Sequence, residues 1–477
     1  MEKLVGRELE KTILSGILES PEAELVAVLG RRRVGKTFLI RSVFENRLVF
    51  EFSGIHEASL NEQLQNFSLA LKAAMGTGIK IAPPVNWIEA FDFLQTHLSS
   101  KKNNQKSVIF FDEFPWAHTP KSGFLAAFEH FWNTWASRQK NIVVVICGSA
   151  AAWMIRHIVN NRGGLHNRIS QKIRLLPFTL RETEEYLNSR KINIDRYQIL
   201  QLYMAIGGIP QYLKDIKPGE SAAKAIDRLC FTKDGKLKGE FNNLYQSLFD
   251  NASIHIAVIR VLANKGRGLN RNEIIAACKI SSGGTATKIL EELVESGFIT
   301  PYIPFDKTVK ESIYKLSDEY SHFYIKFMEK TRSKGADTWL KTMEGTSWKS
   351  WSGFAFEGIC LKHIRQIKRA LSIGGVQTEE SVWRYVPGKN ETGAQIDLLI
   401  DRKDHCINIC EMKYSVAPFM IDKRYAGELQ KKINVFREKT KTRKTLFLTM
   451  ITSYGVNENI HYTGLVQKEI RMDALFK

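Results

Sequence analysis

The pattern G-x-x-x-x-G-K-T at residues 30–37 constrains the fold of this 477-residue chain more than any other stretch. An apolar run at 24–29, of strand length, precedes it, and a helical run at 38–46 follows it. A glycine-rich turn between a strand and a helix N-terminus directs backbone N–H groups at a phosphate, and the helix dipole favours negative charge there. The pattern therefore predicts a phosphate-binding loop in an α/β domain with a parallel sheet.

Residue types within this loop match a nucleoside triphosphate and its magnesium ion. Lys36 would reach the β- and γ-phosphates, and the Thr37 hydroxyl would ligate Mg²⁺. We expect the contacts to ATP to come from nine consecutive residues: Gly30, Arg31, Arg32, Arg33, Val34, Gly35, Lys36, Thr37 and Phe38. The alternative is a decayed loop that is only structural.

Two further apolar runs end in polar residues that such a site needs. The run at 107–111 ends in Asp112 and Glu113. Asp112 would hold the metal, directly or through water, and Glu113 could polarise the attacking water as a general base. The run at 142–147 is followed by Gly148 and Ser149, and Ser149 could contact the γ-phosphate or the water. An acidic loop and a simple turn are the alternatives.

Arg168, in the segment 164–168, is a candidate arginine for sensing the γ-phosphate. It could act within one chain or across the interface of a homo-oligomer, and a solvated arginine is the alternative.

The segments VGRELE (5–10), GRRRVGKT (30–37), FFDEFPW (110–116), ICGSAAAWM (146–154) and GGIPQY (207–212) occur in this order. Together they resemble the archaeal-type ATPase family, a branch of the STAND/AAA+ P-loop ATPases, over about residues 1–230. The resemblance implies that the G-R-E and G-G-x-P segments lie near the nucleotide base, which implicates Arg7 and Pro210. Members of the family often end in a nuclease-like domain.

The middle of the chain has the pattern of a winged helix-turn-helix. Three helices are expected: the first at 254–262, the second beginning after Asn270, which would be its N-cap, and the third at 285–296. Two strands are expected at 298–302 and 312–316. The third helix could lie in a DNA groove, with phosphate contacts from Lys288, Lys307 and Lys310. The acidic residues on that helix leave a rigid spacer between domains as an equal alternative.

In the last third, an expected helix at 351–370 carries Glu357, and strands are expected at 381–385, 394–400 and 406–413. The strands carry Asp397 and the E-x-K pair Glu411 and Lys413. This order resembles the PD-(D/E)XK nuclease superfamily. One departure is Gln395, which stands where many relatives have a second acid.

Strand geometry gives these residues a chemical interpretation. Residues two apart share a face, so Glu411 and Lys413 point the same way. Hairpin pairing would bring Asp397 beside Glu411 to hold Mg²⁺ or Mn²⁺, with Glu357 in the outer metal shell. Lys413 would orient or deprotonate the attacking water. An E-x-K pair on a solvated strand is the alternative.

The chain is basic, with a formal net charge of +19, so a polyanion is the expected partner, first DNA and second an acidic membrane surface. Nine of the basic residues lie between 421 and 444, where a helix would pack one face and present charge on the other. The N-terminal residues do not resemble a signal peptide, and no apolar run reaches the roughly 20 residues of a membrane span. We therefore expect a cytoplasmic protein that does not bind a membrane.

The sequence thus predicts an α/β chain of four domains. They are a P-loop ATPase core (1–180), a helical lid (181–245), a winged helix-turn-helix (246–335) and a PD-(D/E)XK nuclease-like domain (336–477). The favoured function is ATP hydrolysis coupled to DNA binding or metal-dependent cleavage. The alternative is a signalling or scaffold ATPase whose nuclease-like domain is inactive and only binds a partner or nucleic acid.

Overall fold

The computed structural model describes residues 3–76, 82–100, 105–160, 163–249, 251–331, 337–343, 345–388 and 393–477. The chain divides into two compact units. Unit 1 comprises Met1–Pro177 with Glu295–Gly297, and unit 2 comprises Phe178–Val294 with Phe298–Lys477.

Unit 1 is built on a five-stranded parallel sheet of order β2-β3-β4-β1-β5. The apolar runs of the sequence form its three central strands, which confirms the strands expected at 24–29, 107–111 and 142–147. Helices cover both faces of such a sheet, and β3 and β4 are accordingly buried along their whole length. The strands are β1 (Glu24–Leu29), β2 (Leu48–Ser53), β3 (Ser107–Asp112), β4 (Ile142–Gly148) and β5 (Gln171–Arg174).

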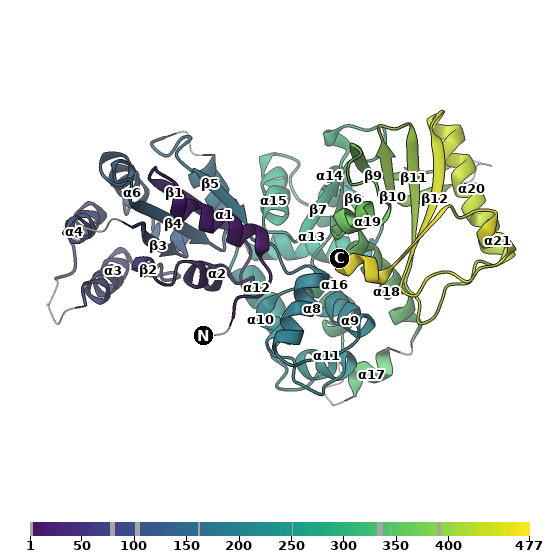
Figure 1. Ribbon diagram of the computed structural model, residues 1–477, viewed down its shortest axis with the longest axis horizontal. Helices are drawn as coiled ribbons and strands as arrows, with labels where there is room; N and C mark the ends of the chain where they lie inside the picture. Colours follow the sequence, from purple (N-terminus) through teal and green to yellow (C-terminus); the bar gives the residue numbers. More distant parts are fainter. Residues whose placement is uncertain are drawn as a thin grey trace. The chain divides into compact units, whose positions relative to one another are not determined.

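An aromatic core packs against this sheet. One buried cluster joins the sheet to three helices that pack against it, and this cluster includes Phe67, Trp87, Phe91 and Phe111. Figure 1 shows these helices, α3, α4 and α6, gathered together in unit 1. The helices of unit 1 are α1 (Glu8–Glu19), α2 (Lys36–Val43), α3 (Leu60–Met75), α4 (Trp87–Ser99), α5 (Phe114–Ala117), α6 (Phe124–Thr134) and α7 (Ala151–Met154).

The first part of unit 2 is helical and then carries a small three-stranded antiparallel sheet of order β6-β8-β7. Asn270 caps α14: its side chain accepts the Glu273 N–H at 2.9 Å, and the Glu273 carboxylate accepts the Asn270 N–H at 2.8 Å. The expected N-cap is therefore confirmed, and β6 adds a third strand to the two that were expected. The elements are α8 (Leu180–Ser189), α9 (Arg196–Ile206), α10 (Pro210–Leu213), α11 (Ala222–Cys230), α12 (Glu240–Gln246), α13 (Ala252–Asn264), β6 (Leu269–Asn270), α14 (Arg271–Cys278), α15 (Gly284–Glu295), β7 (Ile299–Tyr302) and β8 (Ile313–Leu316).

The rest of unit 2 contains a second five-stranded sheet, of order β13-β12-β11-β10-β9. Strands β9, β10 and β11 are antiparallel, whereas β11, β12 and β13 run parallel. The parallel step from β11 to β12 passes through α20, the basic helix that the sequence predicted. The elements are α16 (Glu319–Phe323), α17 (Thr338–Thr342), α18 (Thr346–Lys362), α19 (Ile364–Ala370), β9 (Thr378–Tyr385), β10 (Ala394–Arg402), β11 (Cys406–Lys413), α20 (Lys423–Thr440), β12 (Thr445–Thr452), α21 (Ile460–Thr463) and β13 (Lys468–Arg471).

The single helix expected at 351–370 is wrong, because the chain breaks at His363 between α18 and α19. The His363 ring is buried, and burial lowers its pKa to about 4, so that the ring is neutral. Nδ1 lies 2.8 Å from the Ile359 carbonyl oxygen, and Nε2 accepts the Leu180 N–H at 3.1 Å. The periodicity of apolar residues along a helix could not indicate this contact with Leu180, which is distant in the sequence.

The predicted domain boundary at 335/336 lies outside the described residues, and the other boundaries within unit 2 stay predictions. None of the helices formed by the described residues is long and apolar enough to cross a membrane.

Helix α20 is held to the second sheet by a buried aromatic contact. The ring of Phe436 is fully buried, with its centroid 5.1 Å from that of Trp383 and 5.3 Å from that of Phe305. We expect Phe436→Ala to lower the free energy of unfolding of unit 2 by about 3–5 kcal/mol, measured by urea denaturation. The exposed neighbour Glu438→Ala should change it by less than about 0.5 kcal/mol. Equal stabilities of the two variants would contradict the packing role of Phe436.

Candidate nucleotide site and carboxylate–lysine site

The loop 30–37 connects β1 to α2, as the pattern predicted. Lys36 is 5% exposed, and its Nζ donates to the carbonyl oxygens of Gly30 at 2.8 Å and Arg31 at 3.2 Å. The ammonium therefore lies inside the loop, where it can exchange carbonyl partners for phosphate oxygens. Gly35 has φ 91°, which favours glycine, although an added methyl carbon at this position would meet open space. The loop thus has the backbone shape and the buried cation that a phosphate chain requires.

A hydrogen bond joins the loop to the end of β3. Thr37 Oγ1 donates to Asp112 Oδ2 at 2.6 Å, and Asp112 Oδ1 accepts the Glu113 N–H at 2.9 Å. A hydroxyl and a carboxylate are oxygen ligands of the type that Mg²⁺ prefers. The structure therefore brings together the two residues that the sequence proposed for the metal.

Glu113 is held in place by Ser149. The Glu113 backbone has φ 41°, an uncommon conformation for this residue type, and its Oε2 accepts both the Ser149 Oγ–H at 2.8 Å and the Ser149 N–H at 3.0 Å. Ser149 is fully buried at the end of β4. In this structure Ser149 therefore orients the candidate base, a partner that the sequence did not indicate.

Two arginines near the loop are buried. Arg7 precedes α1 with φ 61°, is 4% exposed and donates from Nη2 to the Val34 carbonyl oxygen at 3.2 Å. Arg31 is 3% exposed, whereas Phe38 is exposed. Arg7 thus contacts the loop itself, and its predicted place near the nucleotide base stays a prediction.

Within the described residues of unit 1, no hydrogen bond or ion pair joins Arg168 to the loop. Arg168 is exposed in the turn 164–168. Pro210 is the first residue of α10 in unit 2, after Gly207 with φ 68°. The roles predicted for both residues stay predictions.

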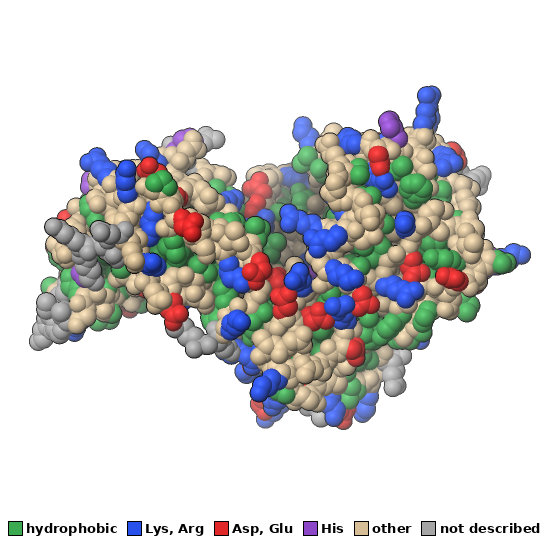
Figure 2. Space-filling model, in the orientation of Figure 1, with side chains coloured by type: hydrophobic (Ala, Val, Ile, Leu, Met, Phe, Trp, Pro, Cys, Tyr) green, Lys and Arg blue, Asp and Glu red, His purple; other side chains and the backbone are tan. Residues whose placement is uncertain are grey.

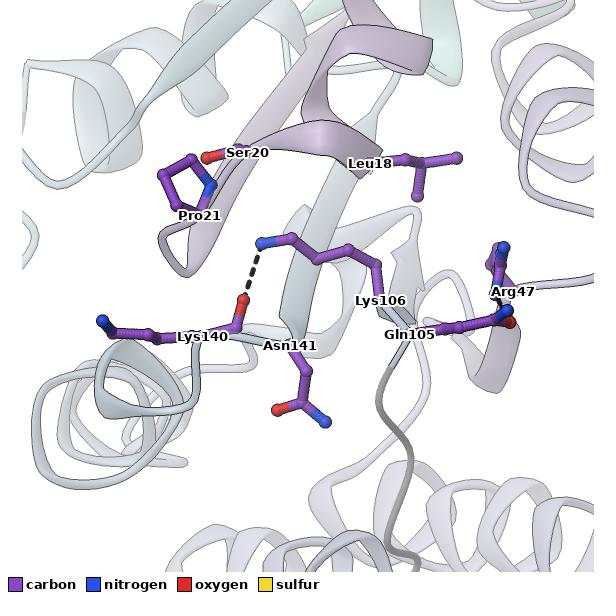
Figure 3. Close-up of a pocket in the computed structure, with 8 residues that line it drawn as sticks. All are labelled: Leu18, Ser20, Pro21, Arg47, Gln105, Lys106, Lys140 and Asn141. Atoms are coloured by element: carbon purple, nitrogen blue, oxygen red, sulfur yellow. Dashed lines mark hydrogen bonds between the residues drawn. The ribbon is translucent and has the colours of Figure 1, made fainter.

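Unit 1 also has a cavity of about 390 Å³ at the amino-terminal ends of its strands, opposite to the ends that carry the phosphate-binding loop (Figure 3). Its lining residues directly precede the strands, whereas the phosphate-binding loop follows β1. Lys106 Nζ donates to the carbonyl oxygens of Lys140, at 2.7 Å, and of Glu22. Burial lowers the pKa of Lys106. Lys106 therefore ties three chain segments together at this edge, and the cavity is separate from the nucleotide site.

In the second sheet, the pairing of β10 with β11 runs from Asp401 opposite Ile407 to Leu398 opposite Cys410, so Asp397 and Glu411 are the next residues along the two strands. Glu411 is 4% exposed, and Ile407 and Ile409 on its side of the strand belong to the core formed with α20. The facing of Glu411 expected from strand alternation is confirmed.

Both carboxylate oxygens of Glu411 already have partners. Oε1 accepts the Tyr425 hydroxyl at 2.6 Å and lies 3.0 Å from Lys413 Nζ, and Oε2 accepts from Lys432 Nζ at 2.8 Å. Burial alone would raise the pKa of Glu411, but the charges of Lys413 and Lys432 and the hydrogen bonds hold it below its ordinary value. Glu411 is therefore ionised, and its negative charge is compensated by the positive charges of Lys413 and Lys432.

The other two acids have different surroundings. Asp397 Oδ1 accepts the Gln395 amide at 2.7 Å, so the glutamine that stands in place of a second acid is a direct partner of the aspartate. Burial, and then the negative charge of Asp397, raise the pKa of Glu357 from its ordinary 4.5 to about 8, against the opposing charges of Lys315 and Lys413. Glu357 is therefore a neutral acid near pH 7.

Metal binding by Glu357, Asp397 and Glu411 stays a prediction. Within the described part of the chain, no three His, Cys, Asp or Glu side chains are grouped so that they could hold a metal ion. Tyr425 and Lys432, the partners that the sequence analysis did not name, lie seven residues apart on α20. Two helical turns separate them, so helical spacing could have placed them on one face of this helix.

Comparison with known proteins supports the first of the two sites. Residues 4–216, a little less than half of the chain, match the family model of an ATPase domain found predominantly in Archaea. These residues thus carry a P-loop ATPase domain of this family, and nucleotide binding follows from it. The chain is also 22% identical, over 76% of its length and 78% of the relative, to the uncharacterized protein MJECL04 of Methanocaldococcus jannaschii.

Among solved structures, the chain is similar to the Walker-type ATPase PabY2304 of Pyrococcus abyssi, with a TM-score of 0.49, 17% identity and coverage of 68% of this chain and 96% of that one. It is also similar to the ORC2 protein of Aeropyrum pernix, with a TM-score of 0.43, 14% identity and coverage of 76% and 96%.

The neutral Glu357 gives a pH dependence of stability that can be measured. The folded pKa of about 8 lies above the ordinary 4.5, so the folded state binds this proton more tightly, and the stabilisation is lost as pH rises toward 8. We expect the melting temperature of the wild type, in EDTA, to fall between about pH 5 and pH 9 more steeply than that of Glu357→Gln. Parallel profiles for the two proteins would show that Glu357 is not neutral in the folded state.

Proposed function

We propose that unit 1 binds magnesium–ATP in the loop 30–37 and hydrolyses it. The observation that carries the proposal is the connected set of polar residues at the carboxyl ends of β1, β3 and β4. Thr37 is bonded to Asp112, and Ser149 is bonded to Glu113, the residue after Asp112. A purely structural loop would not require a buried serine aimed at a carboxylate.

Each of these residues has a role in the proposed reaction. Lys36 binds the β- and γ-phosphates, and the N-terminus of α2 faces the same group. Thr37 and Asp112 would hold Mg²⁺, which neutralises charge on the phosphates when bound. Glu113 orients the attacking water and accepts its proton, while Ser149 keeps the Glu113 carboxylate at the correct angle.

The roles of Glu113 and Ser149 can be separated by steady-state kinetics. Glu113→Gln should bind ATP with unchanged affinity and lose at least about 100-fold in kcat, because it cannot accept the proton. Ser149→Ala should lose between about 10-fold and 150-fold in kcat with little change in KM, since a charge-assisted hydrogen bond stabilises by about 1.5–3 kcal/mol. Ser122→Ala, whose hydroxyl donates to the Thr119 carbonyl oxygen at 2.8 Å, serves as the control. Undiminished hydrolysis by Glu113→Gln would remove Glu113 from the role of base.

For unit 2 we propose a helical lid at 181–245, a winged helix-turn-helix at 246–335 and a nuclease-like domain at 336–477 that binds the DNA backbone. The support comes from α20 and the residues after it, where Lys423, Arg424, Lys431, Arg437, Lys439, Lys441 and Arg443 are exposed. The opposite face of α20 is packed through Leu429 and Phe436. A helix with one apolar face and one basic face presents fixed positive charge to phosphates.

Two features favour backbone binding by this domain over metal-dependent cleavage. Lys413 and Lys432 compensate the charge of Glu411, and no cluster of three His, Cys, Asp or Glu side chains lies around it among the described residues. In the winged-helix segment, Lys288 and Lys307 are paired with Glu292 at 3.8 Å and Glu311 at 3.0 Å. On α20, Arg424 and Lys439 are also paired, but further exposed basic residues remain beside them, so α20 is the stronger candidate for the DNA contact. Figure 2 shows basic and acidic side chains interspersed over the visible face of unit 2, without one continuous basic patch.

DNA binding by α20 predicts a characteristic salt dependence. Replacing Arg424, Lys431 and Arg437 by Ala should weaken binding to unrelated DNA sequences equally and lower the salt slope by about 0.9 for each phosphate that the variant no longer neutralises. Fluorescence anisotropy in EDTA measures both quantities, and Lys72→Ala in α3 is the control. An unchanged salt slope would contradict the proposed surface, and DNA cleavage by the wild type with Mg²⁺ or Mn²⁺ would favour the nuclease.

A further inference from the structure

We propose that Lys432 occupies the place of a divalent cation at Glu411 and so determines that this site takes no metal. The inference deepens the function proposed for the nuclease-like domain and rests on it. The sequence resemblance implies a metal held by Asp397 and Glu411, whereas the structure places two ammonium groups at one of these carboxylates. Lys413 belongs to the E-x-K pair itself, so Lys432 is the additional cation.

The contacts of Glu411 leave little room for a metal ligand bond. Lys432 Nζ lies 2.8 Å from Oε2, while Tyr425 and Lys413 lie 2.6 Å and 3.0 Å from Oε1. A metal ion binds through the same lone pairs that these donors now use. A divalent cation at Glu411 would therefore have to displace Lys432 or share one carboxylate with two ammonium groups.

Electrostatics favours the lysine over the metal in this position. Glu411 is 4% exposed, and a buried carboxylate without a cation is strongly destabilised. With Lys432 and Lys413 present, that charge is already compensated, and a further charge of +2 would be repelled by both lysines. The remaining carboxylate, Asp397, has its own donor in Gln395 and adds only one negative charge.

The packing of α20 keeps Lys432 at this place. Leu429 and Phe436 lie three residues before and four residues after Lys432, and both are buried in the core of the second sheet. Residues at these spacings share one helix face, so the lysine is directed at β11 by the same face that packs. Tyr425, on this face as well, contacts the same carboxylate. Because both neighbours are anchored, Lys432 is not a mobile surface chain.

The test is the affinity of the metal-stripped, full-length chain for Mn²⁺, measured by isothermal titration calorimetry without nucleotide. We expect Lys432→Met to bind Mn²⁺ at least tenfold more tightly than the wild type, because the competing cation is removed. Lys431→Met, the exposed neighbour on α20, should match the wild type. Adding Glu411→Gln to Lys432→Met should abolish the gain, which assigns the bound metal to this carboxylate.

Two results would overturn the inference. Equal Mn²⁺ affinity of the wild type and Lys432→Met would show that the lysine does not compete with metal. No binding by either protein would show that something other than Lys432 excludes the metal. Circular dichroism on each variant confirms that it is folded, and anisotropy with DNA reports separately whether the proposed backbone binding itself fails.

Discussion

The hydrogen bond between Thr37 and Asp112 is the contact on which the nucleotide site depends, because it joins the start of α2, the helix after β1, to the end of β3, and β1 and β3 are not neighbours in the sheet. In the order β2-β3-β4-β1-β5, strand β4 lies between β1, which precedes the phosphate loop, and β3, which ends in Asp112. Ser149 follows β4 and can therefore reach Glu113 from the middle position. Because the carboxyl ends of parallel strands share one edge, three separate segments supply one site.

The carboxylate–lysine site in unit 2 follows a different electrostatic principle. In the nucleotide site, Lys36 interacts with neutral carbonyl oxygens and keeps its charge for an anion. At Glu411, two lysines and a tyrosine compensate the carboxylate within the chain. The Lys36 ammonium is held by carbonyl dipoles, so its positive charge is available to a phosphate. The Glu411 carboxylate already has two positive partners, so binding a metal ion would add little electrostatic stabilisation. This difference is the physical reason to propose catalysis at the first site and binding at the second.

Much of the fold could be predicted because the chain carries strong local patterns. The buried strands of unit 1 are nearly continuous apolar runs. The spacing of Gly30 from Gly35 and Lys36 is typical of a phosphate-binding loop and of few other structures. The capping of α14 by Asn270 could be predicted for the same reason, since both of its hydrogen bonds are local.

Contacts between distant residues could not be predicted in this way. At the break between α18 and α19, His363 accepts a hydrogen bond from Leu180, and Glu113 accepts one from Ser149, 36 residues further on. Likewise, E-x-K spacing indicated that Glu411 and Lys413 share a face, but it contained no information about Lys432. Sequence patterns thus identified candidate site residues, while their protonation and their partners depended on packing.

The central claim, that Thr37 and Asp112 hold the magnesium ion of ATP beside Glu113, is tested most directly by a crystal structure with Mg²⁺ and a non-hydrolysable ATP analogue. We predict the triphosphate in the loop 30–37, Lys36 Nζ on its phosphate oxygens, and the metal bound to the Thr37 hydroxyl with Asp112 beside it. A loop that stays empty at saturating analogue, or a metal ion remote from both residues, would contradict the account.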